Sequence, residues 1–505
     1  MLSFNDKTLF FFCSLSMAVL LPFQTQACSL GIIFPANGTI FKTPEAVVFG
    51  QGSATTEEGD QGSVTATLNG TTVLSFSGSF STATSFFGSR GVSVTLQPGV
   101  NIFNARGSVG GCSASVSMVY EPEESPSNNG YSSNNTCHPI NISTGNKFFS
   151  ELQYSGSGAS PLILSKAYNS NSTHQYWWFS YLQYLDIHDG LVQAYRHDGQ
   201  VINFTEESTG TFTAPFQRKE RLSFAANKYS LRLADNTVET YNSNGQLVSI
   251  WHPSNIIHTI SYTNNNTITI TRHNEQLTLN LTGDNLTQVT LPDGSNINYS
   301  YDNVNTVSRL KSVAYADGST KSYVYGNAEF PLYITEILDE NGNSISSVSY
   351  DDQGRAISSE VGGLGSGIER TEIEYHADGT RTVTNSLGKQ NTYHFTQFNG
   401  EYKMTRVEGH ASDNCASANQ AYTYDSNGFM ASKTNWKGNL TTYVHNARGL
   451  ETSRTEASGT PQARTITTEW HPTFNLRTKI TEPERETVLT YDTNRRLTAT
   501  EVNPR

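Results

Sequence analysis

The residue types that carry catalysis in enzymes are present in this sequence, but their spacing matches none of the common catalytic patterns. No serine lies in a Gly-x-Ser-x-Gly context, and the sequence contains no Gly-Lys-Ser/Thr phosphate loop and no His-Glu-x-x-His zinc motif. His252 and His258 lie six residues apart, but no cluster of carboxylates accompanies them. We therefore expect a protein that is not an enzyme and that holds no cofactor.

Two turn sequences contain oxygen ligands of the kind that calcium prefers, at residues 351–354 (Asp-Asp-Gln-Gly) and 425–428 (Asp-Ser-Asn-Gly). A calcium loop of the EF type needs further acidic residues and a closing Glu, which both segments lack. Asp and Asn also stabilise turns by accepting hydrogen bonds from their own backbone two residues further on. The second explanation is favoured, and no metal site is predicted.

Tryptophan side chains could form stacking platforms for sugars. Trp177, Trp178, Trp251 and Trp470 are more simply explained as core residues. Trp436 lies beside a Lys-Gly-Asn turn sequence, and it is the residue expected to contact a ligand if one binds. Surface glycan is therefore one class of partner to consider.

A short pattern occurs twice between residues 420 and 450, and it organises most of the chain. An aromatic residue, polar turn residues, a glycine and an apolar residue follow one another from Tyr424 through Gly428, and again from Tyr443 through Gly449. Asn-Gly is a strong hairpin signal, because Gly adopts positive φ without steric cost. The two copies start 19 residues apart, which leaves room for about two short strands and two turns.

Similar units recur through more than half of the sequence, with successive anchor residues 19 to 29 residues apart. The anchors are Tyr241, Tyr262, Leu281, Tyr301, Tyr325, Tyr350 (with turn glycine Gly354), Tyr375, Phe395, Tyr424, Tyr443, Trp470 and Tyr491. A period in the twenties with strand and turn composition predicts an array in which each unit buries its apolar face on its neighbours. The pattern resembles the YD repeat of Rhs and teneurin-like proteins, and the resemblance covers residues 137–505.

The composition agrees with an all-β protein. Only 15% of the residues are charged, and the chain contains 25 Tyr, 25 Phe and 40 Gly. Aromatic and β-branched side chains favour strands, and helical periodicity is nearly absent. The formal net charge is −12 and no run of basic residues occurs, so nucleic acid is not expected as a partner.

Residues 1–27 have the pattern of a signal peptide. Lys7 precedes an apolar run from Leu9 to Leu21, and small residues occupy the positions that a signal peptidase reads before Ala27. We therefore expect an exported protein, either secreted, periplasmic or on the cell surface. Cleavage after Ala27 would leave Cys28 first, so lipidation of Cys28, with membrane attachment, is an alternative to a soluble form.

Removal of the signal peptide would leave four of the five cysteines, and an even number in an exported protein favours pairing. Cys28 and Cys112 lie near the two ends of the first predicted module, so we predict a disulfide between them. Cys137 and Cys415 remain, and the sequence does not assign their pairing. The absence of Cys-x-x-Cys excludes a zinc ribbon or a redox motif.

The chain divides into four segments after the signal peptide. Residues 28–120 alternate short strands with turn residues, which predicts a seven-stranded sandwich similar to bacterial immunoglobulin-like modules. Residues 121–136 have the composition of a linker. Residues 137–230 form an opening module before the repeats, and residues 231–505 form the repeat array.

The opening module carries the most specific family signal. The Thr-Gly-Asn-Lys sequence at 144–147 and the Tyr-Asn-Ser sequence at 168–170 resemble the module that precedes the repeats in Rhs proteins. That resemblance implies a sheet that spirals into a hollow shell around a toxin. The sequence ends at Arg505 without the Asp-Pro-x-Gly core segment of that family, so we expect a curved, open, spiralling sheet.

These features leave three classes of function to weigh. The favoured one is a non-catalytic exported scaffold that resembles the shell part of a polymorphic toxin system but is truncated, with a downstream core or toxin polypeptide as its partner. The alternative is a cell-surface adhesin or carbohydrate-binding protein. An enzyme finds no support in the sequence.

Overall fold

The computed structural model describes residues 28–35, 39–41, 45–55, 61–79, 85–96, 99–108, 111–120, 129–130, 135–136, 139–172, 175–214, 218–264, 266–304, 307–398, 401–411 and 417–505. The predicted signal peptide, most of the predicted linker, Cys137 and Cys415 lie outside these ranges. The described residues form strands and turns without any helix, so none of them belongs to a helix that could cross a membrane. The prediction of an all-β fold is therefore confirmed.

The chain divides into two compact units, with the main boundary between residues 122 and 123. The strands of the first unit are β1 (Cys28–Phe34), β2 (Thr39–Phe41), β3 (Glu45–Thr55), β4 (Gln61–Leu68), β5 (Thr71–Ser79), β6 (Ser85–Thr95), β7 (Gly99–Gly107) and β8 (Ser113–Tyr120). They form a sheet of order β1-β3-β6 and a second sheet of order β2-β8-β7-β4-β5. These eight strands are one more than the sequence predicted, and the immunoglobulin-like identity of the unit stays a prediction.

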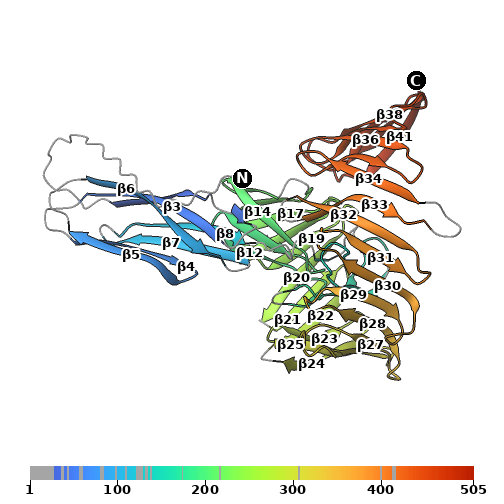
Figure 1. The fold of residues 1–505 in the computed structure, drawn as a ribbon, viewed down its shortest axis with the longest axis horizontal. Helices are drawn as coiled ribbons and strands as arrows, with labels where there is room; N and C mark the ends of the chain where they lie inside the picture. The colour runs from blue at the N-terminus through green and yellow to red at the C-terminus, as the bar shows by residue number, and fades with distance from the viewer. Residues whose placement is uncertain are drawn as a thin grey trace. The chain divides into compact units, whose positions relative to one another are not determined.

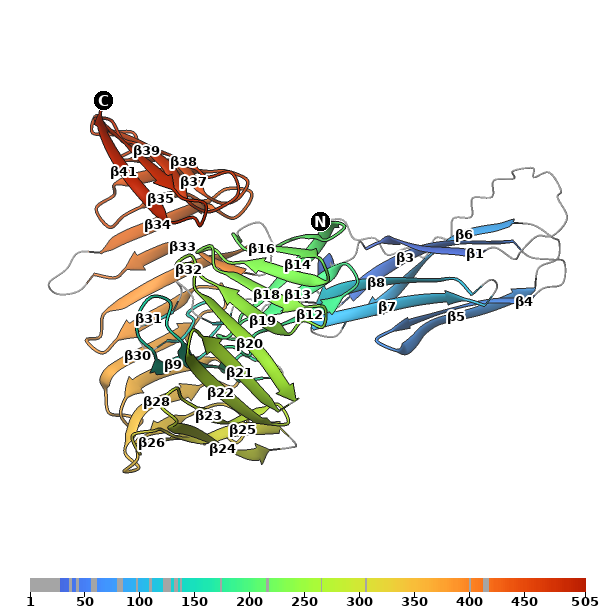
Figure 2. The same ribbon diagram turned by 180° about the vertical axis from the view of Figure 1, so that it is seen from behind.

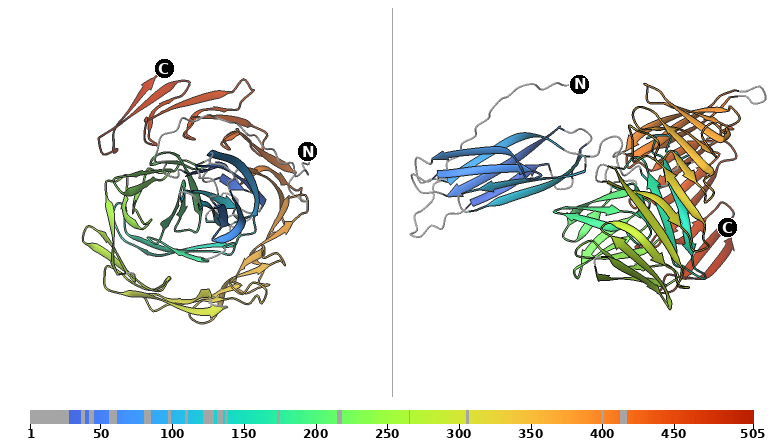
Figure 3. Two further views of the ribbon diagram at one scale, coloured as in Figure 1. Left: turned by 90° about the vertical axis from the view of Figure 1, so that its left-hand side faces the viewer. Right: turned by 90° about the horizontal axis from the view of Figure 1, so that it is seen from below.

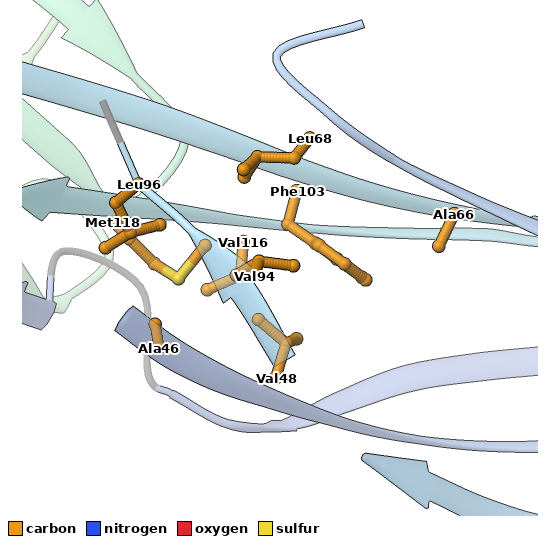
Figure 4. Close-up of a cluster of buried hydrophobic side chains, with 9 residues drawn as sticks. All are labelled: Ala46, Val48, Ala66, Leu68, Val94, Leu96, Phe103, Val116 and Met118. Carbon is orange, nitrogen blue, oxygen red and sulfur yellow. The ribbon is translucent and has the colours of Figure 1, made fainter. Parts of the chain in front are cut away.

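The two sheets of the first unit share one apolar core. Alternation along the strands directs one side of each sheet into this core. The buried side chains are Ala46, Val48, Ala66, Leu68, Val94, Leu96, Phe103, Val116 and Met118 (Figure 4). Cys112, which immediately precedes β8, is disulfide-bonded. The side chain of Cys28 is outside the described part, so the Cys28–Cys112 pairing stays a prediction.

The second unit begins with a small sheet of order β11-β10-β9. Its strands are β9 (Phe148–Ser155), β10 (Ile163–Asn169) and β11 (Trp177–Phe179). We call residues 139–181, which include this sheet and the preceding Thr-Gly-Asn-Lys turn, the plug. The turn is tied to the sheet because the Asn146 side chain donates to Asn169 Oδ1 over 2.8 Å.

All later strands of the second unit form one 30-stranded sheet in which each strand is hydrogen-bonded to the next in sequence (Figures 1 and 2). They are β12 (Tyr184–His188), β13 (Leu191–Tyr195), β14 (Val201–Ser208), β15 (Thr211–Thr213), β16 (Arg221–Ala225), β17 (Lys228–Arg232), β18 (Val238–Asn242), β19 (Leu247–Trp251), β20 (Ile257–Asn264), β21 (Thr267–Arg272), β22 (Glu275–Thr282), β23 (Asn285–Thr290), β24 (Asn296–Val304), β25 (Val307–Ala314), β26 (Thr320–Val324), β27 (Glu336–Leu338), β28 (Ser344–Tyr350), β29 (Ala356–Val361), β30 (Ile368–Tyr375), β31 (Arg381–Asn385), β32 (Gln390–Phe398), β33 (Glu401–Gly409), β34 (Ala418–Tyr424), β35 (Met430–Thr434), β36 (Leu440–His445), β37 (Glu451–Glu456), β38 (Arg464–Trp470), β39 (Arg477–Thr481), β40 (Arg485–Tyr491) and β41 (Leu497–Pro504). Those 30 strands make an open antiparallel strip, as the sequence predicts.

Local turn chemistry explains why the chain reverses so regularly. In the turn after β34, Asp425 Oδ1 accepts the N–H groups of Asn427 and Phe429 over 2.9 and 3.0 Å, and Gly428 N–H donates to the Asp425 carbonyl over 3.0 Å. Gly428 has a φ of 76°, which a residue with a Cβ adopts only at a cost. The Asp425 carboxylate therefore stabilises its own turn.

The two ends of the strip differ. At the first end, Leu185 N–H donates to the Gly245 carbonyl over 2.9 Å, and Tyr184 forms a bridge with Gln246, so the turn after β18 covers the edge of β12. At the other end, β41 is the last strand of the sheet, and every residue in it is exposed. Its outer backbone edge therefore has no neighbouring strand among the described residues.

The strip winds back on itself. Residues of the turn after β17 contact residues of the turn after β38, and the hydrogen-bonded pair Asn236 and Asn475 is separated by 239 residues. In Figure 3 (left) the strands of the second unit follow this curved path from green through yellow to red. The result is a spiralling sheet, as the sequence predicts.

Candidate functional site

The long sheet has one face that contacts the plug, and we call this the inner face. Aromatic side chains form much of the contact. The ring of Trp177 lies 4.7 Å from that of Tyr323, and the rings of Phe179 and Tyr299 are 5.4 Å apart in an edge-on arrangement. Pairs of this kind stabilise a contact beyond the area they bury. The inner face of this part of the strip therefore packs against the plug through aromatic pairs.

Tyr168 joins the plug to the backbone of the strip. Its hydroxyl donates to the Leu332 carbonyl over 3.2 Å and accepts the Ile334 N–H over 3.1 Å. Burial raises its pKa well above the usual value, so the phenol stays neutral. The Tyr-Asn-Ser sequence predicted to mark the opening module therefore supplies a buried polar link.

A buried ionic group lies at the same contact. Lys166 Nζ is 2.9 Å from Glu151 Oε2, and Lys321 of the strip lies 3.0 Å from Glu151 Oε1. Tyr315 donates a hydrogen bond to Glu151. Burial opposes ionisation of Glu151, but the Lys166 charge and these hydrogen bonds lower its pKa overall. Burial lowers the pKa of Lys166 to about 8 although Glu151 favours the charged form.

The Thr-Gly-Asn-Lys turn of the plug packs on a hairpin turn of the strip. Gly145 accepts a hydrogen bond of 2.9 Å from Ala356 N–H, and its φ is 79°. A Cβ at this position would lie 2.5 Å from the Cβ of Arg355. Lys147 Nζ donates to Ser359 Oγ over 3.0 Å, and burial lowers the pKa of Lys147 to about 8. Gly145 and Lys147 therefore fix the plug against β29.

The first repeat is stabilised by a buried ion pair. Arg196 donates to both carboxylate oxygens of Glu239, over 2.6 and 2.7 Å, and Tyr241 donates to Glu239 Oε2 over 2.6 Å. Burial alone would raise the pKa of Glu239, but Arg196 and the hydrogen bonds from Tyr241 and Gln183 lower it. Because the carboxylate is fully satisfied, it can remain charged in the core.

Later anchor residues share a different contact. The hydroxyl of each of these tyrosines donates to a backbone carbonyl of the preceding unit, and Trp470 does so through its indole nitrogen. The pairs are Tyr262 with Leu247, Tyr301 with Leu286, Tyr325 with Leu310, Tyr350 with Ile334, Tyr375 with Ala356, Tyr424 with Met404, Trp470 with Glu451 and Tyr491 with Arg477, at 2.6 to 3.0 Å. Predicted anchors such as Tyr350, Tyr424 and Tyr491 therefore occupy equivalent places.

Most of these carbonyls lie opposite a β-bulge. The residue that faces the bulge across the hairpin, such as Ala356 opposite Tyr350 or Arg477 opposite Trp470, supplies the carbonyl for the next anchor. A bulge leaves one backbone group outside the ladder, and a buried carbonyl without a partner is costly. Most anchors thus donate a hydrogen bond to a carbonyl at the β-bulge of the unit before them.

One predicted anchor is displaced. In the hairpin of β36 and β37 the bulge falls at His445, which pairs with Glu451, whereas Tyr443 pairs regularly with Arg454 two residues earlier. The turn residues Asn446 and Gly449 correspond to Asp425 and Gly428 of the previous unit. The equivalent of Tyr424 is therefore His445. The mismatch arises because the aromatic residue in this copy lies two residues further from its glycine.

The inner face changes along the strip. The strand pairings place Tyr393, Val407 and Gln420 on one face of the sheet. Residues two apart in a strand share a face, so the pairs Tyr422–Lys433 and Lys433–Thr441 continue this face to Tyr443. Tyr393 packs against the plug residues Ile140 and Ile142 in a shared core. Of the apolar residues described after Gln390, only Val407, Phe429, Leu450 and Ile466 are buried. The inner face of β34–β41 is therefore much less covered than the part against the plug.

The structure separates Trp436 from the other tryptophans. Trp177 and Trp178 are buried in the plug, and Trp251 and Trp470 are partly buried beside Arg495 and Arg477. Trp436 is 43% exposed in the turn after β35. Its role as a ligand-contacting residue stays a prediction, and no aromatic ring contact of Trp436 is found among the described residues.

Two histidines that could carry chemistry lie in contact with each other in the second unit. His252 and His258 have ring centres 4.5 Å apart, and burial lowers the pKa of both imidazoles. His258 Nε2 lies 3.0 Å from the Ser160 carbonyl, which connects it to the plug. Across the described ranges, no three His, Cys, Asp or Glu side chains come together as a metal site. Arg196, Glu239 and Lys166 had no sequence signal beyond their type, because their partners are distant in the chain.

Two family models match overlapping parts of the second unit. A model described as Teneurin YD-shell matches residues 195–361, and a domain of unknown function, DUF6531, matches residues 137–204. The second match falls on the plug and the first strands of the strip. These matches support an Rhs/YD-repeat protein with a shell-like scaffold, as the sequence predicted. No curated protein matches the chain by sequence.

Solved structures with a similar arrangement are distant. A crystal structure of TcdB2-TccC3-TEV has a TM-score of 0.30 and 10% identity, and the match covers 70% of this chain but only 19% of that one. The CARDB domain of a Pyrococcus furiosus protein, in complex with di-metal ions, has a TM-score of 0.17 and 14% identity, covering 20% of this chain and 97% of that chain. At these scores neither structure adds to the functional conclusion.

Proposed function

We propose that this chain is a non-catalytic exported scaffold, in which the long sheet is the wall of a shell and the inner face of β34–β41 receives a further polypeptide. The single observation that carries the proposal is that inner-face side chains are buried against the plug but are much less covered in β34–β41. Against the plug, Trp177 and Tyr323 bury each other. Further along, Tyr443 and Lys433 lie on the same face with much less covering.

The proposed partner is a core or toxin polypeptide encoded after residue 505, so that the chain is the front part of a secreted toxin system. The similarity of residues 195–361 to the YD-shell model supports this choice. Export rests on the sequence of residues 1–27. The sandwich of residues 28–120 would then serve as an immunoglobulin-like spacer, ahead of a linker at 121–136, an opening module at 137–230 and the array at 231–505.

Co-purification with the polypeptide encoded immediately downstream tests this proposal. Tyr443→Glu places a charge on the inner face and should abolish association. Val444→Glu is the matched control, because the neighbouring side chain points to the opposite face and is already 59% exposed. Retained binding by Tyr443→Glu, or equal loss in both variants, would contradict the proposed inner-face site.

A second candidate is carbohydrate binding by a cell-surface adhesin. The 43% exposure of Trp436 favours it, since solvent-accessible aromatic side chains can support sugar rings. Binding to a glycan array that is lost in Trp436→Ala would establish this function. Binding that survives the substitution would exclude Trp436 as the contact.

A further inference from the structure

Two turns of the spiral meet at a seam formed by their hairpin ends. Arg232 Nη1 donates to the Thr473 carbonyl over 2.6 Å, and Asn475 N–H donates to Asn236 Oδ1 over 2.8 Å. The Asn236 side chain returns a bond of 3.3 Å to the Asn475 carbonyl. Residues from the first and the last repeats are therefore side by side.

Four arginines gather at this seam, and we call Arg221, Arg232, Arg448 and Arg495 the arginine cluster. Arg221 and Arg232 are directly paired across β16 and β17. Arg448 donates to the His471 carbonyl over 2.6 Å. The guanidinium of Arg495 lies 4.4 Å from the ring centre of Phe474, and that of Arg232 lies 5.5 Å from the same ring.

None of the four has a carboxylate partner in the part of the chain that the structure describes. Arg221 donates to the carbonyls of Arg218 and Glu220, and the bonds of Arg232 and Arg448 also end on carbonyls. Arg232 Nε is buried without any hydrogen-bond partner. Elsewhere in the sheet, arginines such as Arg309 and Arg355 are paired with nearby aspartates. In a chain of net charge −12, this gathering of positive charge is unusual.

The positive charges of the arginine cluster lower the pKa values of neighbouring arginines in the cluster. Burial lowers the pKa of Arg232, and the charges of Arg221, Arg448 and Arg495 lower it further. Burial and Arg221 also lower the pKa of Arg448. Each of the four residues is only partly buried.

Arg495 of the arginine cluster has an unusual backbone conformation. Arg495 N–H donates to the Asp492 carbonyl over 2.9 Å, the bond that Gly428 and Gly354 make in other turns. Arg495 therefore occupies a glycine position, with a φ of 68° that is unfavourable for a residue with a Cβ. This conformation puts its guanidinium 3.8 Å from the ring centre of Trp251.

We propose that the arginine cluster is a binding site for an oxyanion group, phosphate or sulfate, carried by a small ligand. Guanidinium groups present paired donors that match the oxygens of such groups, and aromatic stacking on Trp251 and Phe474 holds them in position. The bound anion contacts arginines from both turns of the spiral. The anion therefore supplies the negative charge that no carboxylate provides to these arginines, and it holds the two turns of the spiral together at the seam.

Titration of the full chain with inorganic pyrophosphate and, separately, inorganic sulfate tests the site, at ionic strength held constant with sodium chloride. Calorimetry should show saturable binding of at least one anion, and the two titrations decide between phosphate and sulfate. Arg495→Gly and Arg232→Gln should each weaken binding about tenfold or more, since a charge-assisted hydrogen bond is lost.

Arg495→Gly is a suitable variant because glycine favours the positive φ of this turn, so the backbone of the turn is kept while the guanidinium is removed. Arg496→Gln is the matched control, since Arg496 is 58% exposed and paired with Asp492 outside the cluster. It should bind as the unaltered chain does. Absence of saturable binding to both anions, or equal weakening in Arg496→Gln and Arg495→Gly, would overturn the proposal. The test does not depend on the scaffold function.

Discussion

The ammonium group of Lys147 donates a hydrogen bond of 3.0 Å to the hydroxyl of Ser359, which lies 212 residues further along the chain. Lys147 belongs to the plug, and Ser359 belongs to β29 of the strip. Lys147 is buried, and among the described residues this hydroxyl is the only hydrogen-bond partner of its side chain. The stability of this contact between the plug and β29 therefore depends on the protonation state of Lys147.

Stability should therefore rise with pH above pH 8. Burial lowers the folded-state pKa of Lys147 to about 8, from 10.5 in the unfolded chain. Between these values the unfolded state binds the extra proton, so the free energy of unfolding increases by about 1–2 kcal/mol from pH 8 to 9.5. Lys166 has a similar shift and adds to the increase.

Lys147→Met should remove the Lys147 part of that increase, whereas Lys437→Met, in an exposed turn, should leave it unchanged. Urea unfolding followed by tryptophan fluorescence measures the effect. All five tryptophans follow residue 123, so the signal reports the second unit. A pH profile of Lys147→Met identical to that of the parent would show that the amine is not buried as described.

Removing an anchor hydroxyl should destabilise the strip according to its burial. Tyr350→Phe leaves the Ile334 carbonyl without its partner in a buried setting, which should cost about 1–3 kcal/mol. Tyr491→Phe removes the same bond to Arg477 where water can replace it, and should cost under about 1 kcal/mol. Equal shifts of the urea midpoint in the two variants would argue against the buried-carbonyl explanation.

Two glycines with similar backbone should respond differently to alanine. Gly145 and Gly379 have φ values of 79° and 86°, so both substitutions strain the turn by about 1–2 kcal/mol. Gly379 has open space around it, but a Cβ on Gly145 would meet the Arg355 side chain and backbone at 2.5 to 2.9 Å. Gly145→Ala should therefore lower the thermal midpoint much more than Gly379→Ala. Similar midpoints would contradict the close packing of this turn.

The ion pair between Arg196 and Glu239 should be sensitive to loss of one partner. Glu239→Gln leaves a buried guanidinium without its counter-charge, and should cost about 3–5 kcal/mol. Glu372→Gln removes an exposed pair with Arg370 and should cost at most about 1 kcal/mol. Guanidinium chloride unfolding of the two variants makes the comparison. A small effect of Glu239→Gln would mean that water reaches Arg196.

Much of the local structure could be predicted because its causes are local. Asp425 and Gly428 form a turn through bonds within four residues and one positive φ, so the sequence alone predicts the hairpin. The same reasoning gave the all-β class and most anchors, including Tyr350 and Tyr424. It misplaced the anchor at Tyr443, since an aromatic residue near a glycine does not by itself define which position carries the bulge.

The tertiary structure decided which distant residues meet. No basic run occurs in the sequence, yet winding brings Arg221 and Arg232 beside Arg448 and Arg495. The partners of Lys147 and Glu239 likewise depend on the curvature of the sheet and on the path of the plug. Turn chemistry acts over a few residues and is written in the sequence, whereas contacts across some 240 residues are set by the accumulated twist of many strands.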